Sequence, residues 1–166
     1  MVRIFFVILW CCLMTLLELM VQAFGLMIPF LACFLFYLAR YFPLKYALTA
    51  AVFGTAILDF CIGRAPVSVI AAVLIVLFGK IWTRQMGGQN FFLHILPGAL
   101  IPLIFYLPWI LWHYSFRGFP VFTPHLLLSA LFTALTLPLW VSLFHLQAKQ
   151  AALETDGDTG TGETLS

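Results

Sequence analysis

Charged residues are the scarcest class in this sequence. Eight Lys and Arg and six Asp and Glu make up only 8% of the 166 residues, whereas 64% are hydrophobic. A water-facing domain carries roughly 25% charged residues, because its surface must be solvated. The composition therefore excludes a soluble globular enzyme and indicates an integral membrane protein.

Acidic residues are not only few but also unevenly placed. Four of the six lie after residue 150, in a stretch rich in Gly, Thr, Asp and Glu: Glu154, Asp156, Asp158 and Glu163. This composition, without an apolar period, predicts that 151–166 is a disordered acidic cytoplasmic tail. Residues 1–150 hold eight basic and two acidic residues, a net charge of +6. The basic residues stand singly, which argues against nucleic-acid binding because that requires clustered Lys and Arg.

Motifs for catalysis, metal binding or phosphate binding are also lacking. There is no GxSxG, no HExxH and no phosphate-binding glycine loop. The cysteines have neither zinc nor disulfide spacing and are expected to pack as small hydrophobic residues: Cys11, Cys12, Cys33 and Cys61. The histidines stand singly near the ends of apolar segments: His94, His113, His125 and His145. We therefore expect no catalytic residue, no cofactor and no metal ion.

Long apolar segments dominate what is present. Charges, prolines and glycines divide the first 150 residues into segments of about the 20 residues that cross a bilayer as a helix. The sequence predicts an all-α polytopic bundle of six transmembrane helices in one domain, 1–150, with spans at 4–22, 25–40, 44–62, 66–83, 92–113 and 124–146.

The distribution of Lys and Arg predicts the orientation. With the N-terminus inside, only Arg64 and Arg117 fall outside, and six basic residues are cytoplasmic: Arg3, Arg40, Lys45, Lys80, Arg84 and Lys149. This distribution follows the positive-inside rule. Both termini are therefore predicted to be cytoplasmic.

Two points of this topology have alternatives. The fifth segment contains Pro97, Pro102 and Pro108, so it is either a full crossing or a re-entrant segment, which would place the C-terminus outside. The first segment ends in Val21-Gln22-Ala23, which resembles a signal-peptide cleavage site. Its apolar run of about 19 residues is too long for a signal peptide's 7–15-residue core, so we expect an uncleaved span.

Two acids lie inside predicted spans, where a charge is costly and marks a contact or a function. Glu18 is near the outer end of its span and is expected to reach the lipid headgroups. Asp59 lies on a helix face of small residues, which favours close helix contact: Ala47, Ala51, Gly54 and Thr55. Asp59 is therefore expected to face protein. Across the Gly63 turn, Arg64 is a candidate partner in a structural ion pair; a subunit or ligand contact is the alternative.

The segment from Gly54 to Gly63, GTAILDFCIG, resembles the third-helix signature of the rod-shape-determining protein MreD family. The resemblance extends to the helix FLFYLAR ending at Arg40, to the basic turn with Lys45, and to Leu137-Pro138-Leu139-Trp140 before a polar basic end. It covers nearly all of 1–150.

The resemblance implies a non-enzymatic scaffold of the cell-elongation (peptidoglycan synthesis) machinery in the bacterial inner membrane. The implied partners are the single transmembrane helix of MreC and, indirectly, MreB and the SEDS synthase with its penicillin-binding partner. The implied fold resembles the substrate-binding subunits of energy-coupling-factor transporters. The alternative function is therefore capture of a vitamin by polar residues at the outer face: Glu18, Gln22, Arg64, His113 and Arg117.

Overall fold

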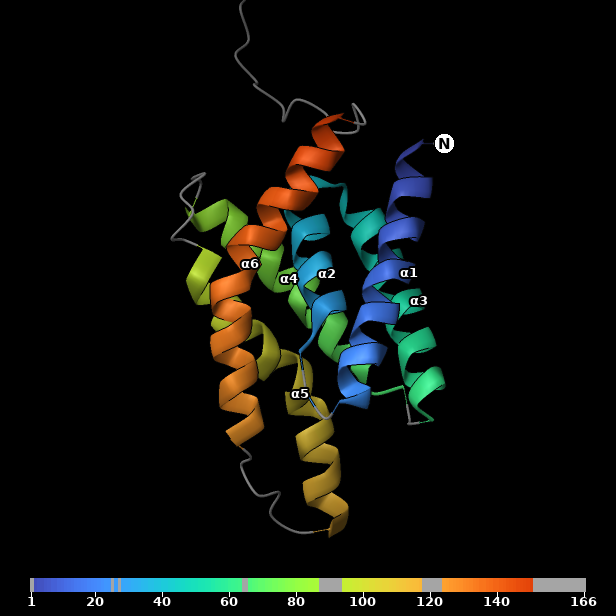
Figure 1. Ribbon diagram of the computed structural model, residues 1–166, viewed down its shortest axis with the longest axis vertical. Helices are drawn as coiled ribbons and strands as arrows, with labels where there is room; N and C mark the ends of the chain where they lie inside the picture. The colour runs from blue at the N-terminus through green and yellow to red at the C-terminus, as the bar shows by residue number, and fades with distance from the viewer. Residues whose placement is uncertain are drawn as a thin grey trace, which may run out of the picture.

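The computed structural model describes residues 2–24, 26, 28–63, 66–86, 94–117 and 124–150. Within these ranges the chain forms helices and no strand, which confirms the predicted all-α class (Figure 1). The helices are α1 (Val2–Ala23), α2 (Phe30–Tyr41), α3 (Leu44–Ile62), α4 (Ser68–Met86), α5 (Ile95–Arg117) and α6 (Pro124–Gln150).

Four of these helices, α1, α3, α4 and α6, are long and apolar enough to cross a membrane. The span predicted at 25–40 is wrong in length, because α2 has only 12 helical residues. Such a helix is about 18 Å long, well short of the roughly 30 Å hydrocarbon core. Helix α5 continues without a break from Ile95 to Arg117, which a re-entrant hairpin would not do. Its crossing of the membrane stays a prediction.

Helix α2 is the centre of the bundle. Every residue from Phe30 to Ala39 is buried, and α2 contacts each of the other five helices. A helix that is apolar all round is a core helix when other helices surround it. Prolines limit its length, since Pro29 occupies the N-cap and Pro43 follows the C-cap residue Phe42. The sequence therefore supplies a short, uniformly apolar helix that the others enclose.

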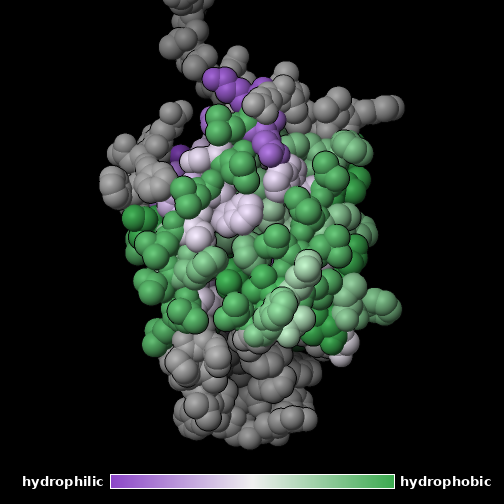
Figure 2. Space-filling view, viewed as in Figure 1, coloured by the Kyte–Doolittle hydropathy of each residue, from purple (hydrophilic) through white to green (hydrophobic). Residues whose placement is uncertain are grey.

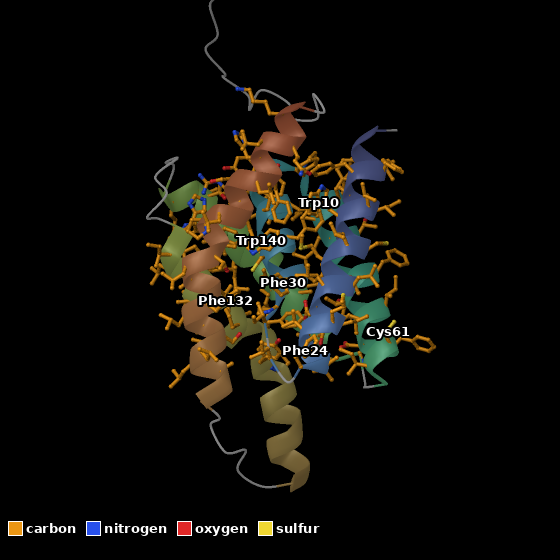
Figure 3. All side chains as sticks on the ribbon, viewed as in Figure 1. Trp10, Phe24, Phe30, Cys61, Phe132 and Trp140 are labelled. Atoms are coloured by element: carbon orange, nitrogen blue, oxygen red, sulfur yellow. The ribbon has the colours of Figure 1, made fainter. Side chains whose placement is uncertain are left out.

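Aromatic side chains join α2 to α1 and α6. Trp10 of α1 and Trp140 of α6 point toward α2 (Figure 3). The Trp10 ring lies 4.9 Å from the Phe144 ring and 6.4 Å from that of Phe34, centroid to centroid. The Tyr37 hydroxyl donates a hydrogen bond of 3.1 Å to the carbonyl of Phe144. Each such aromatic pair contributes about 0.5–1.5 kcal/mol beyond its burial, so the cluster fixes how α1 and α6 sit against the core.

Basic residues gather at one end of the bundle. The start of α1 and the end of α6 lie at the same end of the bundle (Figure 1), and hydrophilic residues collect there above an apolar belt (Figure 2). We call this the basic end, because helix ends there carry five basic residues whose side chains the structure describes: Arg40, Lys45, Lys80, Arg84 and Lys149. The opposite end is called the far end. Successive helices run in alternating directions, so the ends of α2, α4 and α6 and the start of α3 all lie at the basic end.

The closest backbone approach described at any glycine is between α5 and α6. A Cβ added at Gly98 would lie 2.7 Å from Ala134 Cα and 2.8 Å from the Thr133 carbonyl oxygen. We therefore expect Gly98→Ala to lower the free energy of unfolding by about 2 kcal/mol through overpacking. A decrease in the free energy of unfolding would be informative, because Gly→Ala inside a helix otherwise raises it by about 1 kcal/mol.

The measurement is chemical unfolding of the purified protein in detergent. Leu96→Ala is the matched control, since the Leu96 side chain is 55% exposed on the same helix. A Gly98→Ala protein as stable as the parent would contradict the close α5–α6 contact.

Candidate functional site

Asp59 joins the end of α3 to the start of α4. Its side chain is only 1% exposed. The backbone N–H of Ser68 donates to Oδ2 at 3.0 Å, and the Ser68 hydroxyl donates to Oδ1 at 2.7 Å. Ser68 is the first residue of α4, so its N–H is one of those that the helix itself leaves unbonded. Asp59 therefore caps α4 from the neighbouring helix, where the helix dipole favours a carboxylate.

The turn after Asp59 requires glycine. Gly63 has φ 70°, in the left-handed region, and its N–H donates to the carbonyls of Asp59 and Phe60. This is a common way to end a helix, and other residues are strained in that conformation. The expected ion-pair partner Arg64 lies outside the described residues. Asp59 is hydrogen-bonded to Ser68, which the sequence analysis did not anticipate.

The small-residue face of α3 is turned into the bundle. Ala47, Ala51 and Thr55 are fully buried, and the Thr55 hydroxyl bonds to the Ala51 carbonyl. A Cβ at Gly54 would lie 2.7 Å from the Cys11 sulfur, so α3 and α1 approach closely there. The face directed toward protein is thus occupied by contacts within the same chain. Ala47, Ala51 and Thr55 are therefore engaged in contacts within the bundle, whereas Gly54 also lines a groove between α1 and α3.

Glu18 is inside the protein, and the expectation that it reaches the headgroups is wrong. Its side chain has no exposed surface. The backbone N–H of Leu31 donates to Oε2 at 3.0 Å, and the Gln22 amide donates to Oε1 at 3.2 Å. Leu31 is the second residue of α2, so Glu18 caps that helix. The sequence did not reveal this role, because it did not show that α2 begins inside the bundle at Phe30.

Glu18 and Asp59 thus perform the same structural task. Each lies in the last two turns of a helix, α1 or α3, and accepts a hydrogen bond from the first turn of the next helix. A buried backbone N–H without a partner costs about 1–3 kcal/mol, and in a lipid-facing bundle no water can supply one. The two acids of residues 1–150 are therefore engaged in holding the two helix pairs α1–α2 and α3–α4 together.

Two histidines whose side chains the structure describes lie at helix ends. Among the described residues no three His, Cys, Asp or Glu side chains lie close enough to hold a metal ion. His94 Nε2 lies 2.6 Å from Arg40 Nη1, which links the start of α5 to the end of α2. The His145 ring lies 5.2 Å from that of Tyr41. The side chains of His113, His125 and Arg117 lie outside the described part of the structure.

A groove of about 730 Å³ runs between α1 and α3. From α1 it is lined by Ile4, Val7, Ile8, Cys11, Cys12, Thr15, Leu16 and Leu19. From α3 it is lined by Lys45, Tyr46, Thr49, Ala50, Phe53, Gly54, Ile57 and Cys61. Its rim is open, since Leu16 is 59% and Phe53 66% exposed. The floor is formed where Gly54 meets Cys11, because these small residues bring the two helices together. We call this the α1–α3 groove.

The two ends of the α1–α3 groove differ in chemistry. Lys45, Tyr46 and Thr49 line the basic end, and the Lys45 Nζ lies 5.2 Å from the centroid of the Tyr46 ring. Toward the far end the lining is apolar, with Leu19, Ile57 and Cys61. Sequence reasoning missed this groove, because α1 is apolar on every side over most of its length and its few polar residues do not mark one face. Only the neighbouring helices distinguish a groove from a lipid-facing surface.

The described residues form an all-helical protein with four helices long and apolar enough to cross a membrane, which is compatible with a multi-pass membrane protein. No family model, curated protein or solved structure matches the chain. The class therefore rests on composition and helix geometry.

Proposed function

We propose that the protein is a non-enzymatic membrane scaffold that holds a partner's transmembrane helix in the α1–α3 groove. The groove itself carries this proposal. Its α1 wall extends from Ile4 to Leu19 and its α3 wall from Lys45 to Cys61. At 1.5 Å per residue these walls are about 22 and 24 Å long. A lipid chain is confined to one leaflet, about 15 Å of the roughly 30 Å core, whereas a helix passes through both. The groove length therefore favours a helix.

The capping role of the two acids in residues 1–150 supports a structural rather than a catalytic function. An intramembrane acid is a functional candidate by default. Here Glu18 and Asp59 both cap helices of the same chain. Their burial and hydrogen bonds account for their presence without a substrate. This is the behaviour expected of a rigid bundle whose outer faces bind other membrane proteins.

The resemblance of the α3 segment to the MreD family suggests the identity of the partner. We propose that the single transmembrane helix of an MreC-like protein occupies the groove, and that MreB and the SEDS synthase with its penicillin-binding partner are bound indirectly. The protein would then lie in the bacterial inner membrane with the basic end, and both termini, in the cytoplasm.

Filling the groove tests the proposal. Cys12 is exposed and lines the groove, so Cys12→Trp would occupy the space of the partner helix without disturbing the core. We expect recovery of MreC by co-purification to fall about tenfold, which corresponds to about 1.4 kcal/mol. Leu135→Trp is the matched control, because Leu135 is 62% exposed on α6, away from the groove. Equal recovery with both variants would contradict the assignment of the groove.

Capture of a vitamin is the alternative function, and the same purification can detect it. Two of its candidate residues, Glu18 and Gln22, bond to each other, and Glu18 also bonds to Leu31. A small molecule that stays bound through purification and is identified by mass spectrometry would favour the transporter function over the scaffold.

A further inference from the structure

The basic end has an unbalanced charge within the described part of the structure. The two acids of residues 1–150, Glu18 and Asp59, cap α2 and α4 at the far end, so they lie away from the lysines and from Arg84 at the basic end. The other four acids of the chain all lie in 151–166. The fold therefore separates the charges of the protein into a cationic surface and an acidic segment.

The cations are positioned to receive an anion. Lys45 and Lys149 are exposed at the start of α3 and near the end of α6. Lys80 is half-buried and donates to the Phe42 carbonyl at 3.1 Å, and Arg84 lies one turn further along α4. Like charges four residues apart on a helix repel each other. An anion bound over this surface would relieve the repulsion, and its contact with lysines from α3 and α4 would link both helices.

We propose that the chain's own acidic segment, residues 151–166, binds across the basic end. The segment begins after Gln150, at the end of α6, and thus at the surface it would cover. Sixteen residues extend at most about 50 Å, enough to cross the end of a six-helix bundle. Its net charge of −4 complements the cationic surface. Because the segment is tethered, its effective concentration there is of millimolar order, so weak ion pairs suffice.

This contact would govern what else can bind at the basic end. Juxtamembrane Lys and Arg attract anionic lipid headgroups. With the segment in place, Lys45 and Lys80 would be shielded from such headgroups and from acidic partners. The contact is electrostatic, so salt weakens it: the screening length falls from about 8 Å at physiological ionic strength to about 3 Å at 1 M. The proposal does not depend on the scaffold function or on the α1–α3 groove.

Zero-length cross-linking tests the contact directly. A carbodiimide joins a lysine amine to a carboxyl group only when the two touch. We expect the full chain, in nanodiscs of zwitterionic lipid at low salt, to give cross-links from Lys45 or Lys80 to acids of 151–166. Their yield should fall at least about fivefold in 1 M NaCl. The quadruple variant E154Q/D156N/D158N/E163Q, which keeps the size of the segment, should give none.

Two controls make the result decisive. Cross-links from Lys149 are not counted, because Glu154 is only five residues away and the two meet by chain connectivity. Mixing isotopically labelled with unlabelled protein separates contacts within one chain from contacts between chains. Absence of cross-links to Lys45 and Lys80, a yield insensitive to salt, or cross-links exclusively between chains would each overturn the proposal.

Discussion

Replacing Asp59 by leucine is expected to lower the free energy of unfolding by about 3 kcal/mol. The substitution removes two hydrogen bonds and leaves the Ser68 N–H and hydroxyl without their acceptor, although Ser68 is buried. Hydrogen bonds to a carboxylate contribute about 1.5–3 kcal/mol, and an orphaned buried donor costs about 1–3 kcal/mol. The measurement is reversible chemical unfolding in detergent, with folded yield from gel filtration as a second measure.

Two milder variants locate the effect in the cap. Asp59→Asn keeps an acceptor for the Ser68 N–H, and Ser68→Ala keeps the backbone bond but loses the hydroxyl one. Each should lower the free energy of unfolding by less than Asp59→Leu does. Loss of the hydroxyl bond in Ser68→Ala should lower it by about 1 kcal/mol. If Asp59→Leu instead left stability unchanged but abolished recovery of the partner, Asp59 would belong to an interface and the capping role would be wrong.

Replacing Glu18 by leucine is expected to have a similar cost, about 3 kcal/mol, through a different helix. The carboxyl group accepts the Leu31 N–H in the first turn of α2, the helix on which all others pack. Without that acceptor the N–H is buried in an apolar surrounding, since Leu31 is fully buried. The first turn of α2 should fray, and the aromatic packing of Phe30 against Trp140, with ring centroids 5.7 Å apart, should loosen.

Controls for Glu18 follow from its two partners. Glu18→Gln retains a carbonyl oxygen that can accept the Leu31 N–H and should recover about half of the lost stability. Gln22→Ala removes only the half-buried amide that bonds Oε1 and should cost about 0.5–1 kcal/mol. A stable Glu18→Leu protein would show that α2 does not depend on this cap, and Glu18 would then be a candidate for ligand binding.

The sequence predicted the long helices well, because charges, prolines and glycines mark their ends. The segment expected at 44–62 coincides with α3, where Pro43 precedes the helix and Gly63 ends it. The burial of Asp59 and of the small residues one, two and three turns before it follows the expected face of α3. These features depend on local chemistry, namely the missing N–H of proline, the left-handed conformation of glycine and the cost of an intramembrane charge.

Helix α2 and Glu18 show where sequence reasoning ends. The segment 25–40 has the composition of a membrane span, yet only Phe30–Tyr41 is helical and the helix is enclosed by the others. In a soluble protein the polar face of a helix reveals which side is buried. In a membrane the lipid is as apolar as the core, so that signal is absent. For the same reason the sequence placed Glu18 among headgroups, although it lies against the start of α2.

The amino-acid sequence by itself indicated the membrane class and determined the all-α fold, the ends of α3 and the separation of acids from bases along the chain. Hydropathy, proline, glycine and charge act on nearby residues of the chain, so these features can be inferred without the tertiary structure. The tertiary structure alone decided that α2 is the core, that Glu18 and Asp59 cap the following helices, and that α1 and α3 leave a groove between them. Those outcomes depend on which apolar surface meets protein and which meets lipid, and only the packing of the helices distinguishes the two.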